Sequence, residues 1–482
     1  MAKTAFDSTV TGLALDPGAA QPLFRQLQDG LRRAVLEGRL AAGARLPSTR
    51  TLAADLGVSR NTVVAAYEQL VAEGYLEGMT GSGTRVSAAL PDAFLDAGAP
   101  EPAAAHGDGG LAAVQAEAAP GRAVPFAPGM PALDAFPHDL WRRLANRVWR
   151  RADPALFGYG EPAGLWPLRQ AVAAYLSSAR GVRCGPGQVI VVSGSQQALD
   201  LSVRLLLRPG AAVLFEDPGY LGARGVFDQA AAELVPVPVD AQGMDVAAGL
   251  AARPDAAMAY VTPSCQYPLG GVLSLERRLE LLDWARRRGA WIVEDDYNSE
   301  YRYAGRPLPA LQGLDEAGRV IYMGSFSKVL FPALRLGYLV LPPDLVARFR
   351  VARRLTDGAA PALTQAALAE FMAQGHFGAH LRRMRKLYLE RRDTLTAALA
   401  ASGLPLDWTV PESGMHLVAR LAAGRDDKAL SGAAAGAGIA APPLSVHYAA
   451  PPRRGGLLLG FAGFAPAALA AAVAGLRRLP GF

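Results

Sequence analysis

The sequence is poor in two residue types, and each scarcity excludes a class of protein. Only two of the 482 residues are cysteines, Cys184 and Cys265. A disulfide framework is therefore excluded, and a reducing compartment, the cytoplasm, is expected. Four of the 49 basic residues are lysines, and none of these follows a glycine. A Walker A phosphate loop needs a Gly-Lys pair, so this class of nucleotide site is also excluded.

Long, strongly apolar runs are also missing. The first residues, MAKTAFDSTV, contain no apolar segment typical of a secretion signal. One uncharged stretch, residues 455–476, is rich in alanine and is interrupted by Gly460, Gly463 and Pro466. A membrane-spanning helix needs about 20 strongly apolar residues. We interpret the stretch as a strand, a turn and a helix that begins at Pro466, and we expect a soluble protein that does not contact membranes.

The length exceeds that of one ordinary domain, and the composition divides the chain into three parts. Residues 18–87 predict a compact unit of helices followed by a hairpin. Residues 88–123 contain Ala, Pro, Gly and Asp in irregular order, which is typical of a flexible linker. From residue 124 to 482, apolar strands alternate with amphipathic helices, which predicts an α/β fold with a helix-covered sheet.

The N-terminal region has the order of elements found in a helix-turn-helix. Residues 48–56 predict a short helix that ends before Gly57, and Ser59 is a predicted N-cap for a helix over residues 60–73. The second helix of such a pair presents its first residues to the major groove of DNA. The segment YLEGMTGSGTRVS then predicts a hairpin with glycines at its tip.

The motif LPSTRTLAADLGVSRNTVVAAYEQLVAEGYLEGMTGSGTRV resembles the winged helix-turn-helix domain of GntR-type regulators along its whole length. The resemblance implies contacts with double-stranded operator DNA at Ser48, Arg50, Ser59, Arg60, Asn61, Thr62 and, on the wing, Gly83. The alternative is a structural helix bundle with ordinary solvated arginines. Charge does not decide between them, because residues 21–87 hold eight Arg against six acidic residues. The ordered motif favours DNA binding.

Three C-terminal segments carry the groups that a pyridoxal 5′-phosphate (PLP) site needs. In SFSKVLFPALRLGY, the amine of Lys328 can condense with an aldehyde, and Arg335 can clamp a phosphate. The segment AWIVEDDY predicts a buried strand that ends in carboxylates. The segment SGSQQALDL predicts a turn into a helix whose free N–H groups bind an anion. Together these groups predict PLP as the cofactor.

The region from about Val124 to the C-terminus resembles the PLP-dependent aminotransferase domain of fold type I. The resemblance implies that Lys328 bonds to the cofactor aldehyde, that Asp295 pairs with the pyridine nitrogen and that Tyr297 bonds the 3′-oxygen. The implied phosphate ligands are Gly194, Ser195, Gln196, Ser325 and Arg335, with Ser327 as a further hydroxyl donor. Tyr220 would pack on the pyridine face, and Tyr159 would reach the phosphate of the neighbouring subunit. Gln266 and Tyr267 stand where aminotransferases have an Asn-Pro-x-Gly loop.

Each of these residues also has a structural interpretation. Lys328 alone is compatible with a surface lysine, residues 294–296 with a solvated acidic turn or a weak Mg²⁺ site, and Tyr159 and Tyr220 with core aromatics. The complete set in the correct order favours the cofactor site. The two cysteines are expected to be inert, although Cys265 lies close to the proposed cofactor loop.

No metal site is predicted. His376 and His380 lie four residues apart, but the sequence offers no third ligand near them, and the neighbouring glycines weaken a helix there. We interpret both histidines as structural or solvent-facing.

A GntR-like winged helix followed by an aminotransferase-like domain resembles the MocR subfamily of transcriptional regulators. The resemblance implies a domain-swapped homodimer that binds operator DNA and senses PLP or an amino compound.

One position departs from the aminotransferase pattern: Leu458 stands where an Arg-Leu-Gly-Phe segment has the arginine that anchors the substrate carboxylate. We therefore expect a regulator whose effector is PLP or an amine without that contact. The alternatives are a working aminotransferase with an accessory DNA-binding domain, and a regulator that has lost PLP. The lysine, aspartate, tyrosine and arginine of the site argue against the second.

Overall fold

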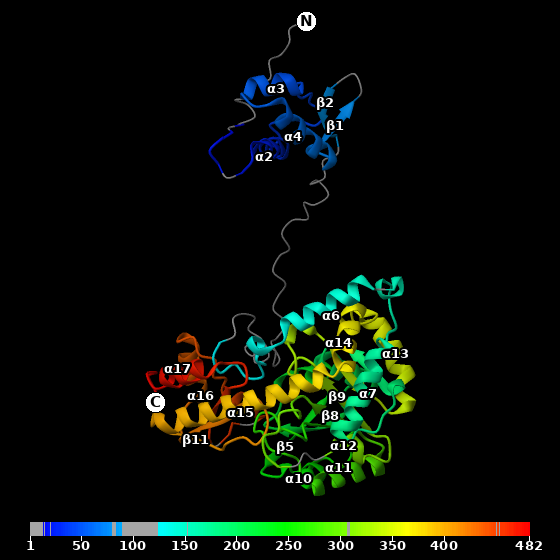
Figure 1. Cartoon of the computed structure of the whole chain (residues 1–482), viewed down its shortest axis with the longest axis vertical. Coiled ribbons are helices and arrows are strands. Elements are labelled where there is room, and N and C mark those ends of the chain that lie inside the picture. The colour runs from blue at the N-terminus through cyan, green and yellow to red at the C-terminus, as the bar shows by residue number, and fades with distance from the viewer. Residues whose placement is uncertain are drawn as a thin grey trace. The chain divides into compact units, whose positions relative to one another are not determined.

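The computed structural model describes residues 13, 15–19, 21–79, 83–88, 124–151, 153–305, 309–449, 451–452 and 454–482. The chain divides into two compact units, Met1–His106 and Gly107–Phe482 (Figure 1). The predicted linker lies outside the described residues apart from residue 88.

The N-terminal unit packs three helices against a short hairpin. Its elements are α2 (Leu23–Leu36), α3 (Thr49–Leu56), α4 (Arg60–Ala72), β1 (Leu76–Met79) and β2 (Gly83–Val86). Buried aliphatic side chains from all three helices and both strands form one core, which includes Leu27, Leu31, Leu52, Val63, Leu70, Leu76 and Val86. The predicted pair of helices and the hairpin are therefore confirmed. The hairpin tip, residues 80–82, lies outside the described residues.

The C-terminal unit is built on a mixed sheet of eight strands in the order β3-β10-β9-β8-β7-β4-β5-β6. These strands are β3 (Val189–Val192), β4 (Ala212–Asp217), β5 (Glu233–Asp240), β6 (Gly243–Met244), β7 (Met258–Val261), β8 (Trp291–Asp296), β9 (Val320–Ser325) and β10 (Gly337–Val340). The strands β4, β5, β7, β8 and β9 are parallel to their neighbours within this set, whereas β10 is antiparallel to both β3 and β9. The carboxyl ends of the parallel strands consequently meet at one edge, where open α/β sheets place their sites.

Helices cover both faces of this sheet, because its strands are apolar on both sides. One face packs against α8 (Ser195–Leu206), α9 (Leu221–Gln229) and α13 (Pro343–Asp357). The other packs against α7 (Trp166–Arg180), α10 (Val246–Ala252) and α11 (Leu275–Arg288). Further helices are α6 (His138–Arg150), α12 (Leu311–Leu314) and α14 (Ala362–Ala373), and short 3₁₀ helices are η2 (Leu133–Ala135), η3 (Pro154–Phe157), η4 (Pro186–Gln188), η5 (Pro332–Leu334) and η6 (Leu444–His447).

A smaller sheet completes the C-terminal unit. Its strands are β11 (Leu406–Trp408), β12 (His416–Leu421) and β13 (Gly456–Gly460), all antiparallel, and its helices are α16 (Asp427–Gly436) and α17 (Pro466–Leu476). The long α15 (His376–Ser402) runs from the large sheet to this part of the unit (Figure 1). The stretch over residues 455–476 therefore forms a strand and a helix that begins at Pro466, as predicted. Among the described residues, no helix is long and apolar enough to cross a membrane.

Candidate DNA-binding surface and cofactor site

Two serines cap the helices of the helix-turn-helix. The Oγ of Ser48 accepts a hydrogen bond from the Thr51 N–H at 3.1 Å, and the Oγ of Ser59 accepts one from the Thr62 N–H at 3.1 Å. Gly57, between the helices, adopts φ +67°, a left-handed conformation that ends α3. These local contacts explain why the sequence forms two short helices with a tight turn between them.

The predicted DNA-contacting residues lie at the starts of both helices and on the hairpin. The side chains of Arg50, Arg60 and Asn61 are exposed, and Thr62 is half-buried. Gly83, the first residue of β2, is also exposed. The arginine at the start of α4 is held loosely, since its Nε lies 3.5 Å from the Oγ1 of Thr49. A weakly restrained guanidinium is available to a phosphate or a base edge.

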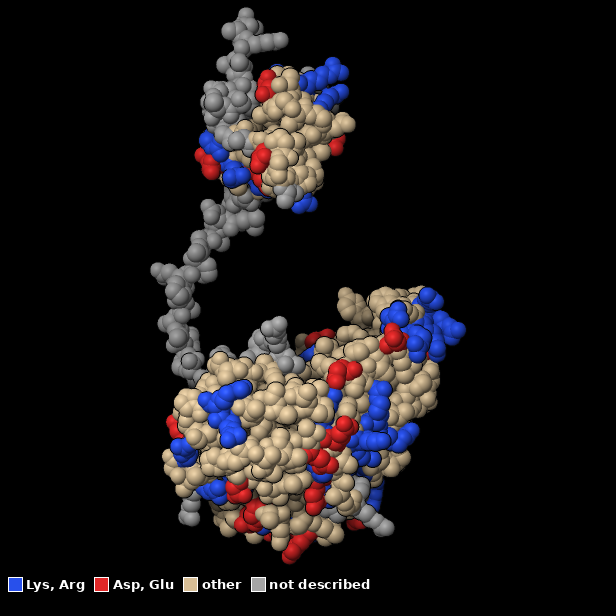
Figure 2. All heavy atoms as spheres, turned by 60° about the vertical axis from the view of Figure 1, so that its left-hand side comes forward, with Lys and Arg blue, Asp and Glu red and all other residues tan. Residues whose placement is uncertain are grey.

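Two further arginines lie beside the wing and were missed from the sequence. Arg45 and Arg85 pair as an isolated antiparallel bridge, and the Arg45 guanidinium lies 3.5 Å from where a Cβ on Gly83 would stand. In the sequence, Arg45 stands just before the helix-turn-helix motif and Arg85 stands within the predicted hairpin. On the face in Figure 2, acidic and basic side chains are interspersed over the N-terminal unit, so charge alone does not mark the DNA-binding surface.

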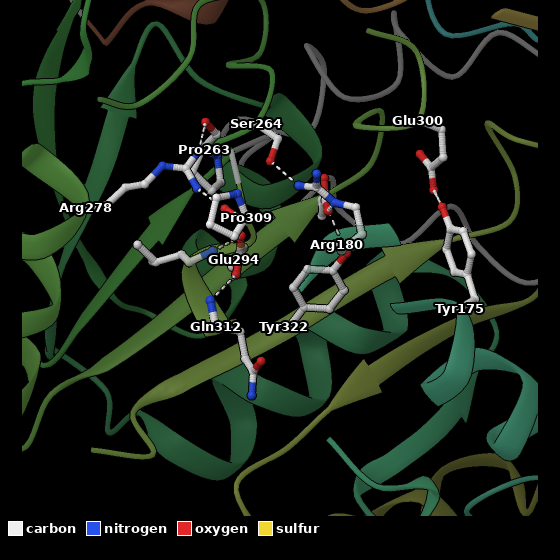
Figure 3. A network of polar contacts seen from close by, with 12 residues as sticks. Tyr175, Arg180, Pro263, Ser264, Arg278, Glu294, Glu300, Pro309, Gln312 and Tyr322 are labelled. Atoms are coloured by element: carbon white, nitrogen blue, oxygen red, sulfur yellow. Dashed lines mark hydrogen bonds and ion pairs between the residues drawn. The ribbon is translucent and has the colours of Figure 1, made fainter. Parts of the chain in front are cut away.

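The three carboxylates of the EDDY segment end β8 and are buried. Glu294 accepts hydrogen bonds at 2.8 Å from two backbone N–H groups at the start of α12. Asp296 accepts from Arg180 Nε at 2.8 Å and from the hydroxyl of Tyr322 at 2.6 Å (Figure 3). Successive strand residues point to opposite faces, so Asp295 points to the other side. The alternative of a solvated acidic turn is therefore wrong.

Asp295 has one satisfied and one unsatisfied oxygen. Its Oδ2 accepts a hydrogen bond from the Tyr260 hydroxyl at 2.7 Å, whereas its Oδ1 is buried and has no hydrogen-bond partner among the described residues. Burial raises the pKa of this carboxyl to about 6, although the Tyr260 hydroxyl and the Lys328 ammonium both lower it. Tyr260, on the neighbouring strand β7, was missed from the sequence, where it appeared as one more residue of an apolar run.

Lys328 lies in the turn that follows β9. Because β9 is parallel to β8 and next to it, this turn emerges at the same edge as Asp295. Gly129 lies against the amine: a Cβ there would stand 2.7 Å from the Nζ of Lys328. Any larger residue would therefore press on the amine, a close approach that the sequence did not reveal.

Four of the predicted phosphate-binding residues, Gly194, Ser195, Gln196 and Arg335, lie at or beside the start of α8. Gly194 is the N-cap residue of this 12-residue helix and adopts φ +116°. A Cβ on Gly194 would stand 3.8 Å from the Arg335 guanidinium, so the arginine lies directly beside the free N–H groups of the helix. The Oγ of Ser325 accepts the Ser327 N–H at 3.1 Å, which folds their loop.

A group of aromatic rings continues from this anion site. The Gln196 amide donates to the Tyr220 hydroxyl at 3.0 Å. The Tyr220 ring lies 5.6 Å from the Tyr267 ring, which in turn lies 6.0 Å from the Tyr297 ring. The Tyr297 hydroxyl lies 3.7 Å from the Sγ of Cys265. The structure thus brings the predicted tyrosines together, except for Tyr159.

Tyr159 stands apart from the other predicted residues. Its side chain is fully exposed, in a loop between η3 and α7. Trp149, Phe157 and Trp166 are also exposed large side chains close to it in the sequence. Within one protomer, Tyr159 therefore has no described contact with the cofactor-site residues.

Three other predictions concern inert residues. His376 begins α15 and His380 is buried within it, where its Nε2 bonds the Val329 carbonyl at 3.0 Å. The expectation that the glycines weaken this helix is wrong, because the helix continues to Ser402. Among the described residues, no group of three or more His, Cys, Asp or Glu side chains can hold a metal ion. Burial raises the pKa of Cys184 to about 11 and raises that of Cys265 too, which keeps both thiols protonated.

Leu458 is buried in β13. It pairs with Val418 of β12, and His416 pairs with Gly460, two residues further along β13. Because side chains alternate along a strand, Leu458 and His416 share one face of the small sheet. No hydrogen bond can come from the leucine side chain, so this face lacks the carboxylate-binding fork of the aminotransferase pattern.

Comparisons with known proteins agree with both halves of the chain. Residues 23–86 match the family model "Bacterial regulatory proteins, gntR family", and residues 130–473 match "Aminotransferase class I and II". A probable rhizopine catabolism regulatory protein MocR of Rhizobium meliloti is 45% identical over 96% of this chain and 95% of its own length. A pyridoxine biosynthesis transcriptional regulator, PdxR, of Corynebacterium glutamicum is 35% identical over 84% of this chain and 85% of its own.

Solved structures match the C-terminal unit. The α-aminoadipate aminotransferase LysN of Thermus thermophilus, in complex with N-(5′-phosphopyridoxyl)-L-leucine, has a TM-score of 0.68 at 32% identity over 73% of this chain and 90% of its own. A Pyrococcus horikoshii kynurenine aminotransferase has a TM-score of 0.69 at 28% identity over 77% of this chain and 94% of its own. The lysine, the unsatisfied Asp295 oxygen and the anion site fit PLP, the cofactor of this fold. The chain therefore belongs to the MocR subfamily of GntR-type transcriptional regulators, with a gntR-family DNA-binding domain before an aminotransferase class I and II domain.

Proposed function

We propose that PLP or an amino compound, bound beside Lys328, changes how the N-terminal unit binds operator DNA. The observation that carries the proposal is the Oδ1 of Asp295, a buried acceptor without a partner near an imine-forming lysine. A buried carboxylate oxygen is costly unless a donor meets it, and a protonated pyridine nitrogen is such a donor. The name of the Corynebacterium relative, a pyridoxine biosynthesis regulator, also supports PLP as a regulatory ligand.

Each cofactor contact is assigned to a residue of this chain. Lys328 provides the amine, Asp295 the carboxylate for the ring nitrogen, Tyr297 the contact to the 3′-oxygen and Tyr220 the ring packed on the pyridine face. The phosphate ligands are Gly194, Ser195, Gln196, Ser325, Ser327 and Arg335. PLP, when bound, supplies an electrophilic aldehyde on an electron-withdrawing ring. The protein orients that aldehyde and keeps Asp295 in position through the Tyr260 hydroxyl.

The DNA-binding residues are those at the helix starts and on the wing. We assign operator contacts to Ser48, Arg50, Ser59, Arg60, Asn61, Thr62 and Gly83. Of these, the exposed arginines contribute the salt-dependent part of the affinity. Ser48 and Ser59 act first as helix caps, so their hydroxyls contribute to DNA binding mainly by fixing the helix starts.

The proposed assembly is a domain-swapped homodimer in the cytoplasm. The exposure of Tyr159, Trp149, Phe157 and Trp166 supports it, since large apolar side chains exposed together are typical of an interface. In such a dimer Tyr159 would donate to the cofactor phosphate of the partner subunit. Ligand binding at a site shared by two subunits can then bias the spacing of the two DNA-binding domains.

DNase footprinting upstream of the gene and of its neighbours, with and without PLP, tests the proposal. We expect a protected pair of half-sites whose extent or affinity changes when PLP is added to the cofactor-free protein. A Lys328→Ala variant is the matched control, because it retains the DNA-binding domain and should not respond to PLP. An identical footprint under both conditions would exclude PLP itself as the ligand that changes DNA binding.

A working aminotransferase with an accessory DNA-binding domain is the second candidate. The similarity of the C-terminal unit to LysN and to the kynurenine aminotransferase favours it, and Leu458 argues against it. Steady-state release of a keto acid from a millimolar α-amino acid separates the two. Sustained turnover would support the enzyme, and its absence in a PLP-loaded protein that binds DNA would support the regulator.

A further inference from the structure

The rings of two buried histidines lie close to the ring of Tyr267. The Tyr267 ring lies 5.5 Å from the ring of His416 and 5.3 Å from that of His447. His416 also interacts electrostatically with Lys328 and with His447. His416 therefore lies within electrostatic reach of the lysine, on the face of the small sheet where Leu458 replaces an arginine, and His447 lies against the same tyrosine ring.

The tautomer of each histidine follows from its hydrogen bond to a carbonyl, which can only accept. The Nε2 of His416 lies 2.8 Å from the Pro268 carbonyl oxygen, and the Nδ1 of His447 lies 3.2 Å from that of Gly219. Each of these nitrogens consequently carries a hydrogen, and the opposite nitrogen of a neutral ring is an acceptor. Burial lowers the pKa of His416, and lowers that of His447 to about 4, so both rings are neutral near pH 7.

The second nitrogen of each ring is an acceptor that the described part of the protein does not use. Neither the Nδ1 of His416 nor the Nε2 of His447 has a hydrogen-bond partner among the described residues. Two acceptors beside an apolar leucine favour a ligand with hydrogen-bond donors and disfavour a carboxylate, which has acceptors alone.

We propose that the effector is an amine that carries hydroxyl groups and no carboxylate, and that His416 and His447 accept hydrogen bonds from those hydroxyls beside Lys328. This inference rests on the proposed function, because the amine is recognised at the PLP site. It adds the chemical class of the effector and the two side chains that select it.

A matched set of three amines on the full-length, PLP-loaded protein tests the inference. Serinol carries two hydroxymethyl groups, isopropylamine has the same carbon skeleton without hydroxyls, and serine has a carboxylate in place of one hydroxymethyl group. Dissociation constants come from isothermal titration calorimetry. We expect serinol to bind at least about 10-fold more tightly than isopropylamine, as two added hydrogen bonds predict, and more tightly than serine. Equal affinities of serinol and isopropylamine, or tightest binding of serine, would overturn the inference without any variant.

Three substitutions then test which side chains recognise the amine. His416→Gln and His447→Asn keep a donor to the Pro268 or Gly219 carbonyl but lack the accepting ring nitrogen, and their amide oxygen occupies a different position, so each should reduce the serinol-to-isopropylamine preference at least about threefold. Leu458→Arg should shift the preference towards serine, because a guanidinium binds a carboxylate with two hydrogen bonds. His138→Asn, at an exposed histidine, is the matched control and should leave the preference unchanged. An unchanged preference in both histidine variants would overturn the assignment.

The same samples distinguish a failure of this inference from a failure of the proposed function on which it rests. The absorbance band of lysine-bound PLP near about 420 nm and the binding of the footprinted DNA are measured alongside each titration. If both are present but the three amines bind alike, the inference fails and the proposed function stands. A protein without the band contradicts both.

Discussion

At the scale of single residues, one strand end holds three consecutive carboxylates in three different ways. Glu294 is capped by backbone N–H groups, Asp296 pairs with Arg180, and Asp295 keeps one buried oxygen unsatisfied. Because side chains alternate along β8, Asp295 points to the opposite face of the sheet from Glu294 and Asp296. This unsatisfied oxygen is the reason we propose Asp295 as a ligand of the cofactor.

Replacing Lys328 with alanine tests the residue on which the chemistry depends. The variant should remain colourless with PLP, without the band near about 420 nm, because no other lysine among the described residues shares the site. Borohydride should attach the cofactor irreversibly to the wild-type chain at Lys328 alone, as read by mass spectrometry of its peptides. Lys386→Ala, a lysine on α15, serves as the control and should retain the band.

The pH dependence of stability should reveal the buried carboxyl of Asp295. Its pKa rises from 3.8 to about 6 on folding, so the folded chain binds a proton that the unfolded chain releases. The resulting stabilisation is complete below about pH 4 and is lost as the pH rises through about 6. At about 1.4 kcal/mol per pKa unit, the loss amounts to about 3 kcal/mol.

Urea unfolding of the cofactor-free wild type and of Asp295→Asn, from pH 4 to pH 7.5, measures this loss. The free energy of unfolding of the wild type, relative to the variant, should fall as the pH rises. Bound PLP should reduce the fall, because a pyridinium nitrogen favours the charged carboxylate. A difference between the two proteins that is independent of pH would contradict the assignment.

At the scale of elements, the helix-turn-helix separates residues that hold it together from those available to DNA. Ser48 and Ser59 cap helices, and Gly57 ends one. Arg60, one residue after the second cap, is exposed and weakly held. The two roles therefore predict different consequences of substitution at neighbouring positions.

Ser59→Ala should mainly reduce stability, whereas Arg60→Ala should mainly reduce DNA binding. Loss of the cap should cost about 1 kcal/mol of stability. Loss of the arginine should leave stability unchanged, weaken operator binding and reduce the slope of log affinity against log salt by about 1. Fluorescence anisotropy over a salt series measures the slope. Arg33→Ala, on α2, is the control, and an unchanged slope in Arg60→Ala would exclude a phosphate contact.

At the scale of the whole molecule, the proposed dimer depends on exposed aromatic side chains. Trp149 and Phe157 lie 6.0 Å apart, and both are more than half exposed. Tyr159 follows them with no described contact to the site of its own subunit. A homodimer would bury Trp149 and Phe157, and it would bring Tyr159 to the cofactor phosphate of the partner subunit.

Substitutions on this surface should separate assembly from cofactor binding. Trp149→Asp combined with Phe157→Asp should yield monomers in sedimentation velocity, because buried charges oppose association. Tyr159→Phe should remain dimeric and bind PLP about 10-fold more weakly, through the loss of one charge-assisted hydrogen bond. A Tyr159→Phe protein with unaltered PLP affinity would contradict the contact across the interface.

Much of both functional regions follows from the sequence, because the signals there are local. Helix caps such as Ser59 act within three residues, and the spacing of Lys328 and Arg335 lies within one loop. The strand and helix over residues 455–476 follow from composition and from Pro466. Near His376 the glycines weaken a helix locally, yet α15 forms there and buries Phe377, His380 and Leu381.

The tertiary structure alone decided which distant residues meet. Tyr260 reaches Asp295 because β7 and β8 are adjacent and parallel, and Gly129 reaches Lys328 across about 200 positions of sequence. The two histidines around Tyr267 come from the small sheet and from η6. Sequence patterns record the contacts between near neighbours, whereas the pairing and register of strands determine which side chains surround the lysine. The sequence by itself therefore predicted the amine and the phosphate-binding segment. The side chains that would make the site selective were determined only by the tertiary structure.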